Sequence, residues 1–470
     1  MKIFAFVAFH MIGWVQAGSC FQSRDHKPTE NTTAATIFAL EYGYPLLVAW
    51  DAIATATINN TGLNKLRIND ELAGAGDKFG IYPNADTLYA EAIFDLSADI
   101  FTLTVPEVDD DRYWSFSFFD GFGENYAVIG SISGSSFGNY TLRWNPQLNG
   151  QTVVEDKGTL CIESPVAYGS LLIRILVRNN GTDLAQSAKI INGCKLTEAG
   201  PRPRAAFDNT PPLSLATFEG LPENATGVLE LTARTLNGFP PINVTNPRAV
   251  DKELNVAGIH QGSYSKPAGV NLTAATNVVI EAIANYEKTC AFFSLGNGWK
   301  RFTTVGLFGA DYVARAYVVA QGQESERITE SLYTYPEGNI SLAEGEAYLA
   351  TFSSKPPIGP TGFWSLTMYQ NGFLVENPIN IYAVGDRSNI TYPDGSLVYG
   401  TGSSSSNETF QILVQSAAAP PPANWTHNWL PSPSNYSDFS VIFRLYSPTP
   451  PLVNGSWPYP IVTKIKAITA

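Results

Sequence analysis

The stretch Tyr113-Trp-Ser-Phe-Ser-Phe-Phe119 decides the fold class, and Asp120-Gly121 follows it directly. Large apolar and small polar side chains alternate along the stretch, and this period of two is typical of a β-strand with one buried face. The Asp-Gly pair predicts a turn. A second stretch, Phe363-Trp-Ser-Leu-Thr-Met-Tyr369, alternates in the same way and runs into Gln370-Asn-Gly372, which is a hairpin signal.

Similar strand-and-turn patterns recur at residues 101–105, 152–162, 171–177, 410–414 and 439–446. Their spacing favours an antiparallel sandwich or jelly roll over an α/β fold. We therefore expect a mainly β protein with some helices, of the β-rich α+β class. It would contain two antiparallel sandwich-like or jelly-roll-like domains with helical connecting segments.

Four segments have helical patterns. Residues 36–58 are rich in Ala and Leu and predict a helix that is broken or bent at Pro45. Residues 182–191 predict a short helix, and residues 273–286 a clearer one that Thr273 caps. Residues 312–319 fit a helix or a strand. The resulting organisation is a signal peptide at 1–17, a polar arm at 18–35, an N-terminal β-rich domain at 36–200, a connecting region at 201–345 and a C-terminal β domain at 346–470.

The first residues predict secretion. Lys2 precedes a short apolar run, and Val15 and Ala17 supply the small residues of a cleavage site. The run is too short to span a bilayer, and no later stretch reaches the roughly 20 apolar residues that a span requires. The C-terminus lacks the apolar tail of a lipid-anchor signal. We expect a secreted protein, extracellular or in the secretory lumen, without a membrane anchor.

Glycosylation motifs agree with this compartment. The chain has thirteen Asn-x-Ser/Thr sequons, which predict N-linked glycans on exposed asparagines. The sequons begin at Asn31, Asn59, Asn139, Asn180, Asn224, Asn243, Asn271, Asn339, Asn389, Asn407, Asn424, Asn435 and Asn454.

The four cysteines, Cys20, Cys161, Cys194 and Cys290, predict two disulfides in an oxidising compartment. Three connectivities are possible. The short separation in sequence favours Cys161 with Cys194, which leaves Cys20 with Cys290.

Composition excludes several classes of function. The net charge of −13 and the absence of a Lys/Arg cluster argue against a nucleic-acid partner. After signal cleavage His26, His260 and His427 remain, at spacings that match no zinc-protease motif. The chain has no nucleophile elbow and no glycine-rich nucleotide loop. We expect neither a metal nor a cofactor, and a small molecule or a sugar as ligand. The sequence indicates no oligomeric state.

Two sets of motifs resemble known families. The N-terminal set resembles the domain-of-unknown-function family 1254: Asn84-Ala-Asp-Thr-Leu-Tyr89, Asp95-Leu96, Val105-Pro106, Arg112-Tyr113, Asp120 and Gly130. The C-terminal set resembles its companion, family 1214: residues 363–369, Asn377-Pro378, Gly385-Asp-Arg387, Asp394-Gly-Ser396, Asn428-Trp-Leu-Pro431, Arg444-Leu-Tyr446 and Gly455-Ser-Trp457. The resemblance implies a two-domain β-rich fold and, since glycosylated secreted versions look typical of filamentous fungi, a fungal protein. Ile381 stands where the pattern has a basic residue, so a ligand different from that of relatives is implied if that residue binds ligand.

The polar run after Pro83 contains the first candidate site. Asp86 and Tyr89 are candidate acid–base residues, and Asn84 is suited to orient a substrate oxygen. The alternative is structural, because Asn84 and Asp86 are also suited to hydrogen-bond the backbone of a tight turn.

Three charged residues and one aromatic residue complete the candidates. Asp311 is a third catalytic candidate, and Arg112 and Arg315 are candidates for substrate binding. On a helix Asp311 and Arg315 are four residues apart, so a plain ion pair is the alternative. Trp429 is predicted to lie in a loop and to bind ligand, whereas Trp114 and Trp364 lie within strands and are predicted to fill the core.

Three functions fit these observations. The leading hypothesis is an enzyme of fungal secondary metabolism that isomerises, cyclises or dehydrates a small organic molecule by acid–base chemistry. The second is an extracellular carbohydrate-active hydrolase or lyase, which needs two carboxylates about 5 to 10 Å apart in a groove; Asp86 with Asp120 or Asp311 are the candidates. The third is a non-catalytic binding or wall-associated glycoprotein.

Overall fold

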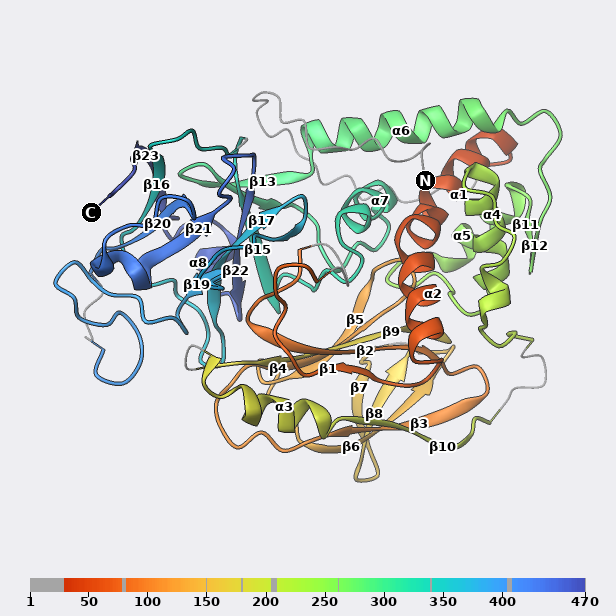
Figure 1. Cartoon of the computed structure of the whole chain (residues 1–470). Coiled ribbons are helices and arrows are strands. Elements are labelled where there is room, and N and C mark those ends of the chain that lie inside the picture. The colour runs from red at the N-terminus through yellow and green to blue at the C-terminus, as the bar shows by residue number, and fades with distance from the viewer. Residues whose placement is uncertain are drawn as a thin grey trace.

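The computed structural model describes residues 29–77, 82–148, 150–178, 181–203, 209–260, 262–338, 340–403 and 408–469. The predicted signal peptide, Cys20, Asn180, Asn339 and Asn407 lie outside these ranges. Figure 1 shows a sandwich of strands at the bottom, a layer of helices above it and, at the left, a second β domain formed by the C-terminal part. The β-rich fold with a few helices is as predicted.

The N-terminal domain is a sandwich of two five-stranded sheets. The first sheet has the order β1-β2-β9-β4-β5 and the second β10-β3-β6-β8-β7, and all pairs are antiparallel except β6 with β8. The strands of the first sheet are β1 Arg67–Asn69, β2 Thr87–Asp95, β4 Trp114–Phe119, β5 Asn125–Gly130 and β9 Tyr168–Leu176. Those of the second are β3 Asp99–Val105, β6 Gly138–Trp144, β7 Val153–Asp156, β8 Thr159–Ser164 and β10 Lys195–Pro201. Helix α3, Leu184–Asn192, precedes β10.

The alternation in residues 113–119 places the large side chains in the core, as predicted. Trp114, Phe116 and Phe118 of β4 belong to the core between the two sheets. Ser115 and Ser117 therefore lie on the opposite face of β4, which is buried as well. What buries that second face is the C-terminal domain, described below.

A bent helix begins the described chain. Helix α1, Thr32–Pro45, continues through the π-helical turn Leu46–Trp50 into α2, Asp51–Asn60 (Figure 1). Proline has no N–H and its ring crowds the preceding turn, so a wider π-helical turn and a bend follow it. Among the described helices this continuous segment, Thr32–Asn60, has a length and composition that could cross a membrane, and 56% of its apolar window is buried in the protein.

The connecting region is mainly helical. It contains α4 Ala225–Thr235, α5 Pro247–Val256, α6 Leu272–Thr289 and α7 Tyr312–Gln321, all of which contact α1. A 3-10 turn, Leu215–Thr217, and the two-stranded sheet of β11 Ile259–His260 and β12 Ser263–Tyr264 complete it. Helix α6 begins one residue before the predicted start, because the side chain of Asn271, rather than Thr273, accepts the capping hydrogen bond from Ala274 N. The ambiguous segment 312–319 is helical.

The C-terminal domain also contains two sheets. The larger follows the order β13-β14-β15-β22-β17-β18, with β19 beside β17, and the smaller the order β21-β20-β16-β23. The larger sheet comprises β13 Phe292–Gly296, β14 Trp299–Phe302, β15 Ser331–Pro336, β17 Trp364–Gln370, β18 Phe373–Leu374, β19 Ala383–Gly385 and β22 Ser440–Tyr446. The smaller comprises β16 Glu346–Phe352, β20 Phe410–Ser416, β21 Trp429–Ser432 and β23 Ile461–Lys466. The 3-10 turn Ala423–Asn428 and the short helix α8, Pro450–Val453, lie between strands.

The predicted hairpin after Tyr369 is present. Strands β17 and β18 pair across the two-residue loop Asn371-Gly372, and both loop residues have positive φ, 52° and 81°. Asn-Gly is the pair that tolerates this backbone best. Strands β13 to β15 already belong to the larger sheet, so the C-terminal fold begins near Phe292 rather than at residue 346.

The predicted Cys161–Cys194 disulfide is wrong in this structure, where the thiols of Cys161 and Cys194 are both free. Cys161 lies on β8 and Cys194 directly before β10, and the sheet order places β6 and β3 between those strands. Three strand spacings of about 4.8 Å separate the two residues, well beyond the roughly 7 Å that a disulfide spans between Cα atoms. A bridge between Cys20 and Cys290 stays a prediction.

Candidate functional site

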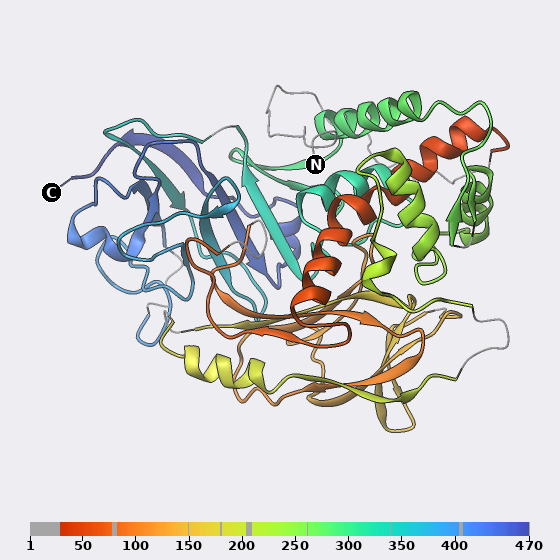
Figure 2. The same ribbon diagram turned by 45° about the vertical axis from the view of Figure 1, so that its right-hand side comes forward.

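The two β domains lie next to each other (Figure 2). The sheet faces through which they meet carry buried polar side chains. In strand β22, Val441, Phe443 and Leu445 belong to the C-terminal core. Ser440, Ile442, Arg444 and Tyr446 alternate with them and face the N-terminal domain. In register with Arg444 lie Tyr333 of β15 on one side and Ser365 of β17 on the other.

The opposing face belongs to the first N-terminal sheet. Tyr89 of β2, Arg174 of β9 and Ser115 of β4 form one row across that sheet. Several contacts join the two faces: Asn84 Nδ2 donates to the Tyr446 hydroxyl at 2.9 Å, and the Tyr113 and Tyr446 ring centroids are 4.8 Å apart. The interface is therefore polar and rich in tyrosine, although it is buried.

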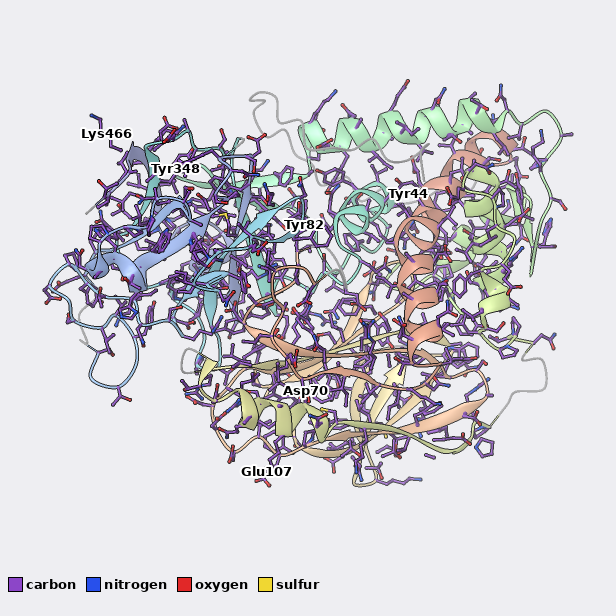
Figure 3. The ribbon with its side chains drawn as sticks, in the orientation of Figure 1. Tyr44, Asp70, Tyr82, Glu107, Tyr348 and Lys466 are labelled. Carbon is purple, nitrogen blue, oxygen red and sulfur yellow. The ribbon has the colours of Figure 1, made fainter. Side chains whose placement is uncertain are left out.

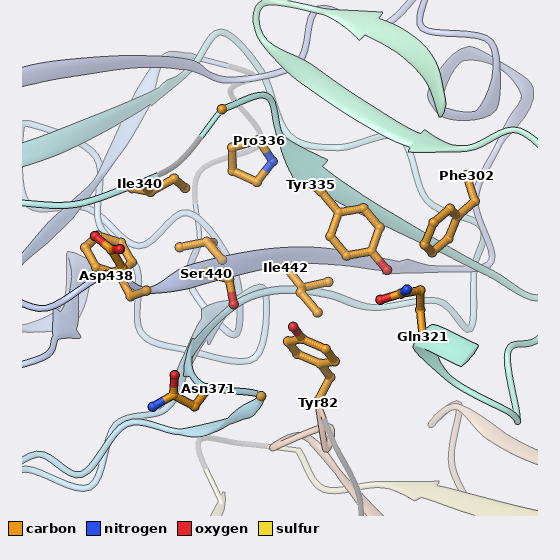
Figure 4. Close-up of a pocket in the computed structure, with 14 residues that line it drawn as sticks. Tyr82, Phe302, Gln321, Tyr335, Pro336, Ile340, Asn371, Asp438, Ser440 and Ile442 are labelled. Carbon is orange, nitrogen blue, oxygen red and sulfur yellow. The ribbon is translucent and has the colours of Figure 1, made fainter. Parts of the chain in front are cut away.

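A pocket of about 310 Å³ opens beside this interface. Its described lining residues are Tyr82, Phe302, Gln321, Tyr335, Pro336, Gly338, Ile340, Asn371, Gly372, Asp438, Phe439, Ser440, Val441 and Ile442. Tyr82 lies between helix α7 and the larger C-terminal sheet (Figure 3). Figure 4 shows Tyr82, Tyr335, Gln321 and Ile442 around one space. The volume is within the range of small-molecule sites, and the aromatic lining suits an apolar or flat ligand.

A second, smaller cavity of about 20 Å³ adjoins the pocket, because Phe302 and Tyr335 line both. Glu326 and Tyr333 also line this cavity. It has room for about one water molecule. A buried carboxyl group, that of Glu326, therefore lines a cavity next to the pocket.

Residues of the N-terminal domain fix the orientation of the Glu326 side chain. Its Oε1 accepts hydrogen bonds from Ser117 Oγ at 2.6 Å and from the Arg174 guanidinium, with which it forms an ion pair. Its Oε2 is buried and has no hydrogen-bond partner among the described residues. One oxygen is therefore fixed and the other is available to a water or a ligand atom.

A chain of tyrosines surrounds this carboxyl group. The Tyr333 and Tyr446 hydroxyls are 2.9 Å apart, and the Tyr113 hydroxyl donates to Glu330 Oε1 at 2.9 Å. Burial, together with the nearby Glu326, raises the pKa of Glu330 to about 8. Burial also raises the pKa values of Tyr113 and Tyr446 well above their usual value, so these phenols stay protonated at neutral pH.

Of the predicted site residues, Asn84, Asp86 and Tyr89 lie at this interface. Asp86 is fully buried, and its two oxygens bind the Arg387 guanidinium and the Ser365 hydroxyl of the C-terminal domain. Asn84 Oδ1 accepts from Asp86 N at 2.7 Å, which is the turn that the structural alternative predicted. Asp86 thus joins the two domains, and both of its carboxylate oxygens are engaged.

Tyr89 packs against Arg174, whose guanidinium carbon is 5.7 Å from the Tyr89 ring centroid. Burial raises the pKa of Tyr89 above its usual value. Its position beside the Arg174–Glu326 pair keeps it a candidate for proton transfer, but it does not line the pocket.

Arg112 lies elsewhere and has a structural role. It is buried and forms ion pairs with Asp110 at 2.7 Å and Asp183 at 3.2 Å, and it donates to the Leu176 carbonyl at 3.2 Å. These contacts tie the loop before β4 to β9 and to the start of α3. Its predicted role in substrate binding is not supported by this position.

Asp311 and Arg315 also lie away from the pocket. Asp311 caps α7 by accepting from Ala314 N at 3.1 Å. Arg315 turns into the core, donates to the Tyr42 carbonyl at 2.9 Å and packs over the Phe122 ring at 4.5 Å. Burial and the neighbouring Glu124 raise the pKa of Asp120, in the same cluster, to about 7. The six polar candidates therefore do not converge on one cavity.

Trp429 is a core residue rather than a loop residue. It lies on β21, is 4% exposed, and its indole N–H donates to the Gln415 carbonyl at 2.9 Å. This position does not support the prediction that it binds ligand, because its ring is buried against Ala347 of β16 and Leu413 of β20. Trp114 and Trp364 are buried in the two cores, as predicted.

The remaining predicted positions concern modification and metal binding. Every sequon asparagine in the described ranges is exposed, which is compatible with glycans at all of them. Within the same ranges, no group of three or more His, Cys, Asp or Glu side chains is placed to hold a metal ion.

Sequence reasoning did not propose as site residues four polar residues of the interface beside the pocket: Glu326, Arg174, Tyr333 and Arg444. A signal existed for the two arginines, because each is a lone charge in an otherwise apolar strand. Such residues are seldom fully buried without a specific partner. Glu326 gave no signal, because it lies in a polar loop after α7.

The fold and the site define a two-domain β-rich protein with a ligand-sized pocket where its domains meet. Residues 63–198 match the family model "Protein of unknown function (DUF1254)", and residues 333–450 match "Protein of unknown function (DUF1214)". The chain therefore belongs to the paired DUF1254 and DUF1214 families, in the predicted order.

One solved structure shows the same fold at a low sequence identity. The crystal structure of the VPA0106 protein from Vibrio parahaemolyticus has a TM-score of 0.65 at 18% identity and covers 93% of this chain and 100% of its own. A putative uncharacterized protein from Burkholderia cenocepacia has a TM-score of 0.41 at 12% identity and covers 93% and 94%. The search of curated proteins returns no match.

Proposed function

We propose that this protein is a secreted glycoprotein enzyme that binds a small organic molecule in the interdomain pocket and transforms it by acid–base chemistry. The observation that carries the proposal is the juxtaposition of the 310 Å³ aromatic pocket with Glu326, whose Oε2 has no partner among the described residues. Isomerisation, cyclisation or dehydration in fungal secondary metabolism fits this machinery.

The proposed role of Glu326 rests on its geometry. A general base needs a fixed orientation and a free oxygen within reach of the substrate or of a bridging water. Arg174 and Ser117 fix Oε1, and Glu326 lines the small cavity that adjoins the pocket. We therefore transfer the acid–base role from Asp86 and Asp311 to Glu326, with Tyr333 as the neighbouring proton donor.

Ligand binding in the pocket is tested with a neutral fluorescent probe, N-phenyl-1-naphthylamine. Ser440 lines the pocket, so Ser440→Trp should fill it and weaken probe binding at least tenfold. Ser440→Ala is the matched control and should bind like the wild type. Equal binding by all three proteins would refute the pocket as the ligand site.

Catalysis is tested on any compound that stabilises the wild type, but not Ser440→Trp, in a thermal-shift screen of small metabolites. Glu326→Gln should lower turnover of such a compound by about 10²- to 10⁴-fold, the usual contribution of general acid–base catalysis. If the wild type binds the compound but does not convert it, the non-catalytic alternative is favoured. The carbohydrate-active alternative has no comparable support, since Asp438 is the sole acid among the described lining residues.

Secretion and glycosylation are tested by expression in a secreting yeast. Enzymatic removal of N-glycans should lower the apparent mass, and peptide mapping should place glycans on exposed sequons such as Asn59 and Asn389. A protein that is retained in the cell without glycans would contradict this part of the proposal.

A further inference from the structure

Arg444 is a buried cation without a carboxylate partner among the described residues. It is 1% exposed, and none of its contacts in those residues is an ion pair. One terminal nitrogen donates to the Tyr369 hydroxyl, and the other donates to the Tyr82 carbonyl at 2.7 Å. The Nε–H has no hydrogen-bond partner in this part of the chain. Buried charges in proteins are normally paired, because desolvation without compensation is costly.

The neighbouring acids do not compensate Arg444. Asp86 is bound to Arg387, and Glu326 is bound to Arg174. The Tyr369 hydroxyl donates its own proton to the Pro83 carbonyl, so it remains a neutral phenol. Within the described part of the chain, these residues of the interface form two ion pairs, and the Arg444 guanidinium is left over.

Arg444 lies close to the pocket. Ser440 and Ile442 line the pocket, and Arg444 is the next residue on the same face of β22, about 7 Å further along the strand. The Tyr82 residue that accepts its hydrogen bond lines the pocket, and Tyr333, whose ring centroid is 5.0 Å from the guanidinium carbon, lines the small cavity. Arg444 is not itself among the described lining residues, so a ligand group would reach the guanidinium by extending past Ile442.

We infer that the ligand of the interdomain pocket is an organic anion, with an apolar or aromatic body between Tyr82, Phe302 and Tyr335 and a carboxylate on a short arm that pairs with Arg444. The inference rests on the proposed pocket and adds the chemical class of the ligand. Guanidinium groups bind carboxylates through charge-assisted hydrogen bonds, and the bare Nε–H supplies a donor for one.

A pair of probes with the same shape tests this inference: 2-naphthylacetate and its neutral amide, 2-naphthylacetamide. Calorimetric titration of the wild type should give at least tenfold tighter binding of the acid, and the preference should persist in 0.5 M NaCl, since buried pairs are screened little. Arg444→Met should lose the preference and still bind the amide. Lys300→Met removes a cation from β14, opposite Tyr335, and should keep the preference.

The possible failures are distinguishable. If both probes bind the wild type equally and Ser440→Trp weakens both, the pocket stands and the inference about charge is overturned. If neither probe binds, or if Ser440→Trp changes nothing, the pocket function itself fails and the inference with it. Should Arg444→Met fail to fold, the wild-type preference at high salt decides alone.

Discussion

The two interface carboxylates, Asp86 and Glu326, differ in what their oxygens contact. Both oxygens of Asp86 are bound by the other domain, whereas one oxygen of Glu326 has no partner among the described residues. A carboxylate whose oxygens are all engaged stabilises the fold, because its partners would be left buried and unpaired without it. A carboxylate with an oxygen to spare is suited to chemistry.

We predict that Asp86→Asn lowers the free energy of unfolding by about 3 kcal/mol and leaves probe binding in the pocket unchanged. The loss arises because the Arg387 side chain, which is 12% exposed, is left without its anion. Chemical denaturation of Asp86→Asn, Arg387→Gln and the double variant would give a coupling energy of about 1–3 kcal/mol. A coupling near zero would show that the pair does not hold the domains together.

Trp429→Ala is expected to cost about 3–5 kcal/mol of stability, the usual effect of removing a buried aromatic ring. Affinity for pocket ligands should not change, since Trp429 packs against Ala347 and Leu413 and does not line the pocket. The nearby Trp425 is partly exposed, so Trp425→Ala should cost less. A selective loss of affinity in Trp429→Ala would restore its predicted role as a ligand residue.

Single strands present two environments at once. In β22, alternate residues fill the C-terminal core or face the N-terminal domain, so Phe443 and Arg444 are both buried for different reasons. The order of strands in a sheet also decides which residues can meet. Strands β3 and β6 lie between β8 and β10, so they separate Cys161 from Cys194 although the two cysteines are close in sequence.

At the level of this sheet we predict the state of the cysteines. In the native protein Cys161 and Cys194 should not react with a thiol reagent, because both are buried and burial raises their pKa values, that of Cys194 to about 12. Both should react in denaturant without a reductant. A non-reducing peptide map that links Cys161 to Cys194 would contradict the strand order.

In the whole molecule, several carboxyl groups in and near the contact between the domains have raised pKa values. Burial is the main cause that raises the pKa of Glu330 to about 8 and those of Asp120, Glu324 and Asp386 to about 7. In the unfolded chain these groups lose their protons near pH 4. Between those values the folded state binds more protons than the unfolded state, so stability falls as pH rises.

The unfolding temperature is therefore predicted to decrease steadily from pH 5 to pH 8. Glu330→Gln, which cannot ionise, should make this slope shallower. Asp394→Asn is the matched control, since the exposed Asp394 has a lowered pKa through its hydrogen bonds to Ser396 and should not affect the slope in this range. Stability that rises toward pH 8 would show that these carboxyl groups are ionised in the folded protein.

The sequence by itself determined the local structure of this protein. Alternation at 113–119 and 363–369 specified strands with a core face, Asn371-Gly372 specified the hairpin, and Pro45 specified the bend in the first helix. Its motifs also identified both families. These features depend on neighbours within one element, so they leave a periodic or local trace.

Only the tertiary structure decided the roles of the polar residues. Asn84 contacts Tyr446 across 362 positions, and Ser117 contacts Glu326 across 209. No spacing records such pairs, because they form when two sheets pack face to face. Tertiary packing also buried Trp429, engaged both oxygens of Asp86 and left Arg444 without an anion among the described residues. Burial and pairing depend on which surfaces meet and not on the order of residues along the chain.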